Sequence, residues 1–247
     1  MRYFLHLSYK GTNYHGWQIQ PNAHTVQAEI QEGLSTILRT KVDIMGSGRT
    51  DTGVHAKVQV AHFDFDEPLD MDQLVHKLNG LLPSDISIQS CAEVKPDAHS
   101  RFDAIERDYR YYINHRKSPF LTTESYYFSY DLDLDLMNAA AKELLGEQDF
   151  ESFSKVKTEV NNFICNISKA EWFEQNDQLV FHVRANRFLR GMVRALVGTL
   201  IQVGQKKLTV EEFKTVIKAK NRKSAGRAVP PHGLFLTAVK YPQEIYL

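Results

Sequence analysis

Two apolar patterns meet in Leu179-Val-Phe-His-Val-Arg-Ala-Asn-Arg-Phe-Leu-Arg-Gly-Met-Val-Arg-Ala-Leu-Val-Gly-Thr-Leu-Ile-Gln-Val203. The alternation over 179–185 predicts a half-buried strand, and the helical spacing over 188–203 predicts the strongest helix of the chain. A strand that is followed at once by an amphipathic helix indicates a domain that mixes both kinds of element.

The rest of the chain continues this mixture. Strands are expected at 2–8, 42–45, 54–65, 86–94, 109–114 and 234–240, and helices after Thr25, Asp70 and Thr209 and around 136–144. Crossovers are too few for a doubly wound parallel sheet, so an α+β fold with mostly antiparallel strands is predicted. We expect two similar halves, 1–105 and 106–247, because Pro96–Ser100 interrupts the pattern near the boundary.

Composition narrows the class of protein. The chain has 247 residues, of which 43% are hydrophobic and 24% charged, and this excludes a disordered or low-complexity protein. Its two cysteines, Cys91 and Cys165, are too few for a disulfide framework or a zinc site. We expect a soluble cytoplasmic protein, because neither an 18-residue apolar run nor a signal-peptide core is present.

The zero net charge hides a strongly basic segment. Twelve lysines and arginines but only two glutamates lie in 184–227, so this segment carries +10 and the remainder −10. Much of the negative charge lies in 64–72 and 131–151. Because contact with phosphate depends on local charge, the segment can bind a polyanion. Solvated helix faces are the alternative explanation.

The loop Gly46-Ser-Gly-Arg-Thr-Asp-Thr-Gly-Val-His55 is the best candidate for chemistry. A phosphate-binding loop is disfavoured because no helix follows it. A metal site with Asp51 and His55 lacks a second carboxylate nearby. A catalytic Asp51 held ionised by Arg49 is a third interpretation, since the two would point the same way in an extended segment. A tight turn with a surface ion pair remains a fourth.

Aromatic and basic residues interleave over Arg107-Asp-Tyr-Arg-Tyr-Tyr112. Such mixtures hold unstacked bases and phosphates in RNA-binding proteins. Tyr109 and Tyr111 should face one way and Arg110 the other, so at most one face serves a site. Ordinary sheet aromatics remain the alternative.

Three arginines follow the helical pattern described first. Arg187, Arg190 and Arg194 are spaced by three and four residues and are expected to share a stripe on one helix. Arg194 lies between Val193 and Leu196, so it should be partly buried and need an anionic partner. A solvated stripe is the alternative, chiefly for Arg190.

Six motifs follow one another along the chain: Tyr9-Lys-Gly-Thr-Asn-Tyr-His-Gly-Trp-Gln18, Gly48-Arg-Thr-Asp-Thr-Gly-Val-His-Ala56, His99-Ser-Arg-Phe-Asp-Ala104, Tyr109-Arg-Tyr111, Phe188-Leu-Arg-Gly-Met-Val-Arg194 and Pro231-His-Gly-Leu-Phe-Leu236. With these motifs in this order, the chain resembles the TruA family of tRNA pseudouridine synthases over nearly its whole length. The resemblance implies two similar α/β halves, ferredoxin-like sandwiches, whose mostly antiparallel sheets form a central active-site cleft.

The resemblance also implies an isomerase that converts uridine to pseudouridine at positions 38, 39 and 40 of the tRNA anticodon stem-loop. Its partners would be tRNA and a second copy in a homodimer, with no metal, cofactor or membrane. By the family pattern Asp51 is the catalytic nucleophile, Arg49 pairs with it or holds the displaced strand, and Arg194 belongs to the active-site floor. The residues that would touch the base are Tyr109, which stacks on it, and Leu234 and Leu236, which line the pocket. The expected RNA-backbone contacts are Arg107, Arg110, Arg187, Arg190, Lys206, Lys207, Lys220 and Lys223.

Two functions of other classes remain as alternatives. A noncatalytic RNA-binding module would use the basic and aromatic surface without needing Asp51. A metal-dependent phosphoesterase would use Asp51, His55 and a further carboxylate.

Overall fold

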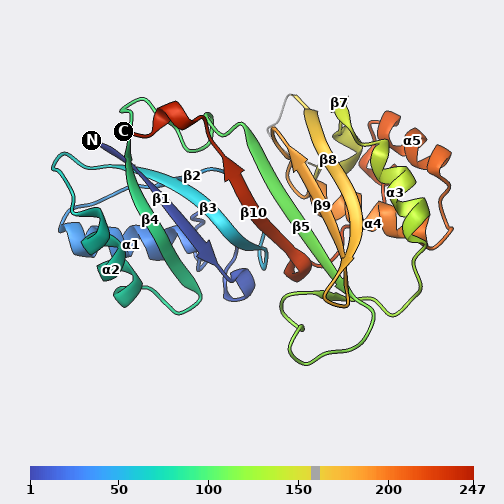
Figure 1. The fold of residues 1–247 in the computed structure, drawn as a ribbon, viewed down its shortest axis with the longest axis horizontal. Helices are drawn as coiled ribbons and strands as arrows, with labels where there is room; N and C mark the ends of the chain where they lie inside the picture. The colour runs from blue at the N-terminus through green and yellow to red at the C-terminus, as the bar shows by residue number, and fades with distance from the viewer. Residues whose placement is uncertain (157–161) are drawn as a thin grey trace. The chain divides into compact units, whose positions relative to one another are not determined.

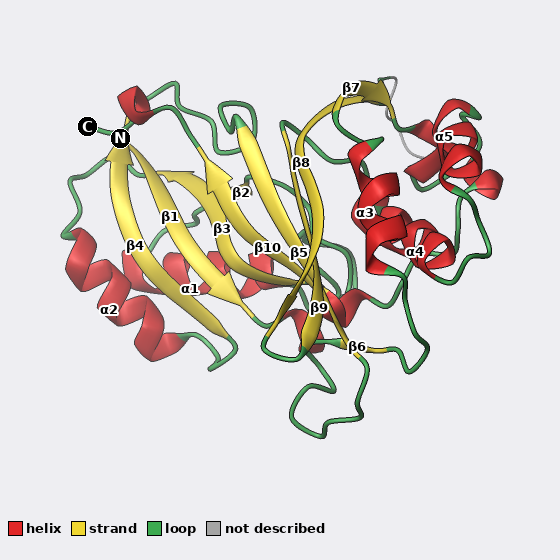
Figure 2. Cartoon of the chain, turned by 45° about the vertical axis from the view of Figure 1, so that its right-hand side comes forward, coloured by secondary structure: helices red, strands yellow, loops and turns green. Residues whose placement is uncertain are grey.

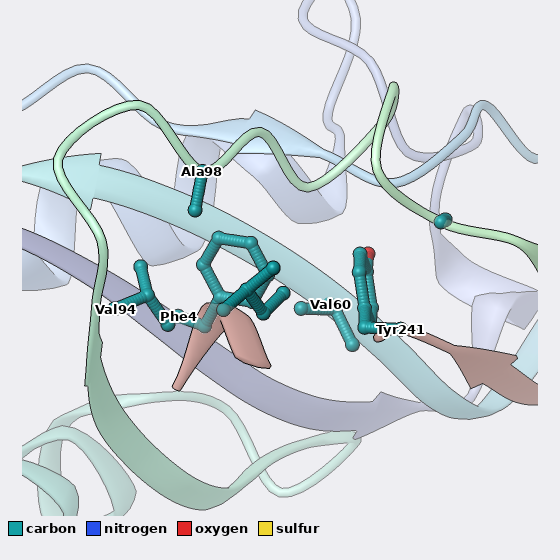
Figure 3. Close-up of a cluster of buried hydrophobic side chains, with 7 residues drawn as sticks. Phe4, Val60, Val94, Ala98 and Tyr241 are labelled. Carbon is teal, nitrogen blue, oxygen red and sulfur yellow. The ribbon is translucent and has the colours of Figure 1, made fainter. Parts of the chain in front are cut away.

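The computed structural model describes residues 1–156 and 162–247, which form two compact units (Figure 1). The first unit contains 1–106 and 236–247, and the second contains 107–235. Residues 236–247 are predicted to belong to the second half, whereas their packing places them in the first unit. The reason is that Tyr241 and Ile245 are buried in one apolar cluster with Phe4 and Val60 (Figure 3).

The first unit is a sheet covered by two helices. Its strands lie in the order β4 (Ile86–Val94), β1 (Arg2–Tyr9), β3 (His55–Asp64) and β10 (Leu234–Lys240), and the short β2 (Met45–Gly46) pairs with β3. β1 is antiparallel to both β3 and β4. Figures 1 and 2 show α1 (Val26–Leu38) and α2 (Met71–Leu81) on the same face of these strands.

Capping residues start these two helices where the sequence predicts. The hydroxyl of Thr25 accepts a hydrogen bond from the Ala28 amide, and the Asp70 carboxylate accepts one from the Gln73 amide. Buried apolar side chains recur at helical spacing on both helices, and this face packs on the sheet.

In its described residues, the second unit repeats the arrangement with three α-helices. Its strands lie in the order β5 (Glu106–Asn114), β9 (Gln178–Ala185), β8 (Ile164–Gln175) and β7 (Gly146–Asp149), and these neighbours are antiparallel. The two-residue β6 (Tyr126–Tyr127) pairs parallel to β5. The helices α3 (Leu134–Lys142), α4 (Met192–Gly204) and α5 (Val210–Lys218) lie together in Figure 2. Two α/β halves with mostly antiparallel strands are thus confirmed.

The strongest predicted helix is shorter than its apolar pattern. α4 begins at Met192 rather than at Phe188, because Gly191 adopts a left-handed backbone with φ +72°. The preceding residue is held outside the helix, since the carbonyl of Arg190 accepts a hydrogen bond from the Lys155 amide at 2.9 Å. The capping box predicted from Thr209 is confirmed at the start of α5.

Within the described ranges, no helix is long and apolar enough to cross a membrane. Cys91 and Cys165 are both free thiols.

Candidate active site

The loop that carries Asp51 leaves β2, enters β3 and is closed at its base. The amide of Ser47 donates to the carbonyl of Val60 at 2.7 Å. The buried Gln59 side chain accepts from the Ser47 hydroxyl and donates to the carbonyl of Gly48 at 3.0 Å. A buried amide that makes both kinds of hydrogen bond fixes the two sides of the loop relative to each other.

Two glycines of the first motif allow the chain to approach this loop. A Cβ atom on Gly11 would overlap the carbonyl oxygen of Val54 and lie 2.7 Å from its carbonyl carbon. A Cβ on Gly16, whose φ is +92°, would overlap the carbonyl oxygen of Thr50 and lie 3.2 Å from the carbonyl carbon of Asp51. Glycine at both positions therefore lets one backbone pack on another.

Hydrogen bonds then join the two motifs. The amide of Trp17 donates to the carbonyl of Thr50 at 3.3 Å, and the amide of Gly53 donates to the carbonyl of Tyr14 at 3.3 Å. The hydroxyls of Tyr9 and Thr50 lie 2.8 Å apart in the interior. The residues on both sides of Asp51 are thus anchored to a segment about 40 residues earlier in the chain.

Asp51 itself starts a turn at the tip of the loop. Its carbonyl accepts a hydrogen bond from the Val54 amide at 3.1 Å, and its side chain is half-buried. Arg49 is exposed and, within the described residues, forms no ion pair with Asp51. The expectation that they point the same way assumes an extended segment, whereas the chain bends at residues 47–48 and turns at 52–53.

The structure also gives His55 a structural role. The residue is buried, and its Nδ1 accepts a hydrogen bond from the Gly11 amide at 2.9 Å. Nδ1 is therefore engaged by the backbone of the first motif. Among residues 1–156 and 162–247, no three His, Cys, Asp or Glu side chains cluster in a way that could hold a metal ion.

In the second unit, Tyr109 and Tyr111 share one face of β5 but differ in burial. Tyr111 is fully buried, and its hydroxyl donates to the carbonyl of Pro230 at 2.8 Å. Tyr109 is half-buried and makes an edge-to-face contact with Phe188, with ring centroids 5.1 Å apart. Tyr111 thus belongs to the core, and Tyr109 keeps an accessible part.

The opposite face of β5 carries a buried ion-pair network. Asp108 lies opposite Arg184 of β9, whose Nε donates to the carboxylate at 2.8 Å, and His182 also hydrogen-bonds this carboxylate. Burial alone would raise the pKa of Asp108, but the bonds from His182 and Arg184 outweigh it and lower that pKa. Asp108 therefore stays ionised with its charge neutralised by neighbouring side chains.

The flanking arginines Arg107 and Arg110 are both half-buried. Arg107 donates to the carbonyl of Asn186 at 2.8 Å. Arg110 lies opposite His182 in the strand register, and its Nε is buried without a hydrogen-bond partner among the described residues.

Arg194 lies in the first turn of α4 and is half-buried, as predicted. Its Nε donates to the carbonyl of Val229 at 2.7 Å, and the Val229 amide donates to the carbonyl of Arg194 at 3.1 Å. Arg187 and Arg190 precede the helix, so the prediction of a single helical stripe is wrong.

Leu234 and Leu236 are two residues apart on β10, and both are buried. Leu234 is counted with the second unit and Leu236 with the first.

The basic segment is partly neutralised by the acidic segment 131–151. Three of its lysines form ion pairs there: Lys206 with Asp133 at 3.2 Å, Lys214 with Glu143 at 3.3 Å and Lys220 with Asp149 at 2.7 Å. Lys207 and Lys223 are exposed and have no carboxylate partner in the described part of the chain. Lys207 precedes and Lys223 follows the nine-residue α5, which is about 13 Å long at 1.5 Å per residue.

Comparison with known proteins identifies the family. A family model described as tRNA pseudouridine synthase matches residues 7–103 and 140–242. The chain belongs to the tRNA pseudouridine synthase family. It is therefore an isomerase of the class that acts on uridine in tRNA, as the six motifs predict.

Curated relatives in this family match along their whole length. The protein named tRNA pseudouridine synthase A of Bacteroides fragilis is 51% identical over 247 residues, which cover 99% of this chain and 98% of the relative. The proteins of the same name from Parabacteroides distasonis and Porphyromonas gingivalis are 50% and 47% identical, with at least 98% of each chain covered. One chain of a solved Cbf5-Nop10-Gar1 complex aligns with this chain with a TM-score of 0.34 and 14% sequence identity. The alignment covers 80% of this chain and 54% of the chain in the complex.

The matched stretches contain the Asp51 loop and Arg194, whereas Tyr109 lies between them. The residues that hold the Asp51 loop in place, chiefly Gln59, Gly11 and Gly16, are not among the predicted site residues. The two glycines of the first motif were the available signal, because close backbone approach is what glycine permits.

Proposed function

We propose that this protein isomerises uridine to pseudouridine at positions 38, 39 and 40 of the tRNA anticodon stem-loop, with Asp51 as the nucleophile. The observation that supports this most is the construction of the Asp51 loop. Its base is locked by Gln59, its tip is anchored to the first motif, and the Asp51 carboxylate stays half-exposed. Preorganised positioning of this kind is what covalent catalysis requires.

The reaction rearranges bonds within one nucleotide. The bond from N1 of the uracil to C1′ of the ribose breaks, a bond from C5 to C1′ forms, and the proton on C5 is replaced by one on N1. Substrate and product are isomers, so no oxidant or energy source is consumed. As the nucleophile, the Asp51 carboxylate forms one transient covalent bond to the nucleotide, and this bond breaks again before the product leaves, so the carboxylate is regenerated.

The other residues act on the extruded nucleotide and on its backbone. Unstacking the uridine costs a few kcal/mol, and stacking on Tyr109 returns roughly 1–3 kcal/mol of it. Arg194 provides positive charge at the floor of the site, and Leu234 and Leu236 provide its apolar lining. The proposed backbone contacts are Arg49, Arg107, Arg110, Arg187, Arg190, Lys206, Lys207, Lys220 and Lys223.

The functional form we propose is a homodimer in the cytoplasm, where tRNA is available. A dimer doubles the number of basic segments that meet one polyanion.

An exchange of Asp51 for asparagine tests the nucleophile. Wild type, Asp51→Asn and the control Asp43→Asn are incubated, with EDTA present, with an unmodified tRNA transcript that has uridines at positions 38, 39 and 40. Asp43 is an exposed carboxylate of the same unit, so its exchange makes the same chemical change away from the loop. The RNA is then digested to nucleosides and separated by chromatography.

We expect pseudouridine from wild type and Asp43→Asn, and none from Asp51→Asn although its Kd for tRNA is unchanged. Turnover by Asp51→Asn would exclude Asp51 as nucleophile. Tight binding without pseudouridine from wild type would favour a noncatalytic RNA-binding protein.

A further inference from the structure

The motif His99-Ser-Arg-Phe-Asp-Ala104 has no role in the proposed chemistry, yet its last residue, Ala104, and the residue before it, Ala98, are both buried. Ala98 and Ala104 flank the loop and belong to the apolar cluster of Phe4, Val60 and Tyr241 (Figure 3). A loop whose two ends are embedded in a core loses little further entropy when it binds a ligand.

Polar contacts fasten the loop to the sheet. The hydroxyl of the buried Ser100 donates to the carbonyl of Met45 at 2.7 Å and lies 2.8 Å from Nδ1 of His62. The Tyr241 hydroxyl donates to the Ser100 carbonyl. Burial, followed by the charges of Arg2 and His99, lowers the pKa of His62 to about 4, so His62 is a neutral partner at physiological pH.

The turn itself is closed by hydrogen bonds between its own residues. The His99 amide donates to the Asp103 carboxylate at 2.7 Å, and the Asp103 amide donates to the His99 carbonyl at 3.0 Å. Nδ1 of His99 accepts from the amides of Arg101 and Phe102 at 3.1 and 3.3 Å. The backbone that carries Phe102 is thus fixed on both sides.

This rigid turn presents an aromatic ring to solvent. The Phe102 side chain is 73% exposed, its ring lies 4.3 Å from that of His99, and the guanidinium carbon of Arg101 lies 5.6 Å from its centroid. Single exposed apolar residues are common. Phe102 differs from them because an anchored loop and an adjacent cation hold it in one place.

A hydrogen bond links the turn that carries Phe102 to β2, the strand that leads into the Asp51 loop. The Ser100 hydroxyl is hydrogen-bonded to the carbonyl of Met45. Asp51 follows Met45 by six residues, so the chain between them spans at most about 20 Å. At about 3.4 Å per base step, this corresponds to about six steps of a nucleic-acid strand. One arm of a bound tRNA is long enough to reach both places.

We propose that Phe102 is a second RNA-contact residue, whose ring stacks on an unpaired base of the bound tRNA while Arg101 faces the adjoining phosphate. Aromatic rings beside arginines are the usual means of holding unstacked bases. The proposal rests on the proposed function only in taking tRNA as the ligand, and it assigns Phe102 to binding rather than to chemistry.

Four substitutions test the stacking. Phe102→Ala removes the ring, Phe102→Trp keeps an aromatic face, and Phe102→Leu keeps apolar bulk without one. Phe120→Ala is the matched control, because Phe120 is 88% exposed in the other unit. The Kd for the tRNA transcript is measured at one fixed salt concentration, and pseudouridine formation at saturating tRNA.

We expect Phe102→Ala and Phe102→Leu to bind tRNA about fivefold or more weakly, the lower limit for loss of one stacked base. Phe102→Trp should bind as wild type does and show quenched tryptophan fluorescence on binding. Phe120→Ala should be unchanged, and every variant should form pseudouridine at saturation.

Wild-type affinity of Phe102→Ala, together with normal pseudouridine formation, would overturn this inference and leave the proposed function intact. Retention of affinity by Phe102→Leu, with a concentration-dependent change in oligomeric state for Phe102→Ala, would also overturn it and assign Phe102 to contact with a second copy. Failure of wild type to form pseudouridine would instead count against the proposed function.

Discussion

Gly11 lies against the carbonyl group of Val54 so closely that any side chain at residue 11 would overlap its oxygen. The amide of the same glycine donates to Nδ1 of the buried His55. One residue without a side chain therefore determines how the end of the Asp51 loop packs on the first motif.

Gly11→Ala should reduce turnover while tRNA binding persists. The added methyl group must push Val54 and hence the turn that starts at Asp51, and overpacking of this kind costs about 1–3 kcal/mol of stability. We expect at least a tenfold lower single-turnover rate, because small displacements of catalytic groups cost roughly 100-fold in rate.

Gly80→Ala is the control for this substitution. Gly80 lies in α2, and a Cβ there meets nothing within 4 Å. The change should leave the rate unaltered and stabilise the protein by about 0.5–1 kcal/mol, as alanine does in a helix. A rate for Gly11→Ala equal to that of wild type would show that the Asp51 loop tolerates displacement.

The ring of Tyr109, rather than its hydroxyl, should contribute to kcat/KM. Tyr109→Phe preserves the edge contact with Phe188 and should keep near-wild-type kcat/KM. Tyr109→Ala should lower kcat/KM by about 5- to 150-fold, the equivalent of roughly 1–3 kcal/mol of stacking. Tyr127→Ala, at a partly exposed tyrosine of β6, is the control. Identical kinetics for Tyr109→Ala and wild type would remove Tyr109 from the site.

The salt dependence of tRNA binding should distinguish two pairs of lysines. Lys207 and Lys223 have no carboxylate partner within the described ranges, whereas Lys206 and Lys220 are paired with Asp133 and Asp149. Each phosphate contact contributes about 0.7–0.9 to the slope of log Kd against log salt concentration. Lys207→Ala/Lys223→Ala should therefore lower the slope by up to about 1.8.

The matched double variant Lys206→Ala/Lys220→Ala removes the same formal charge. Its slope should change less, because ion-paired lysines release fewer counterions when RNA binds. Equal changes in the two double variants would contradict the distinction between paired and unpaired lysines.

His62 should make the first unit sensitive to acid. Its folded-state pKa is about 4, below the ordinary value of 6.5, because burial and neighbouring positive charge disfavour its protonation. The unfolded chain therefore binds a proton that the folded chain does not, and stability falls as the pH decreases from about 6.5 to about 4. The contribution of this group is about 1–3 kcal/mol.

Urea unfolding of wild type and His62→Gln at several pH values measures this effect. The difference in unfolding free energy between the two proteins should shrink as the pH falls through that window. His76→Gln, at an exposed histidine of α2, should follow the wild-type curve. A difference that stays constant with pH would show that His62 does not resist protonation.

Local patterns were sufficient to predict most helices and strands and to identify the family. The alternation over 179–185 and the cap at Thr209 both correspond to observed structure, because strand and helix faces and helix caps involve residues close together in sequence. The spacing of Arg187, Arg190 and Arg194 wrongly predicted one helical stripe, because local spacing does not show where the helix begins. A left-handed Gly191 interrupts a pattern that apolar spacing alone extends.

Spacing along the sequence could not predict which side chains pair with one another. Asp108 stands between Arg107 and Tyr109 in the sequence, but the register of β5 with β9 places Arg184 and His182 on its carboxylate. Arg49 is two residues from Asp51, yet the loop bends, and the described part of the structure contains no ion pair between these two side chains.

The sequence by itself determined the α+β class, the family and the residue types at the candidate site. These depend on periodicity and on short ordered motifs, which are properties of neighbouring residues. Only the tertiary structure decided that Gly11 and Gly16 hold the Asp51 loop and that the charge of Asp108 is neutralised. It also decided that acidic residues in 133–149 form ion pairs with three lysines of the basic segment. Each of these depends on groups between 34 and 76 residues apart, which meet only when strand register and packing fix their positions.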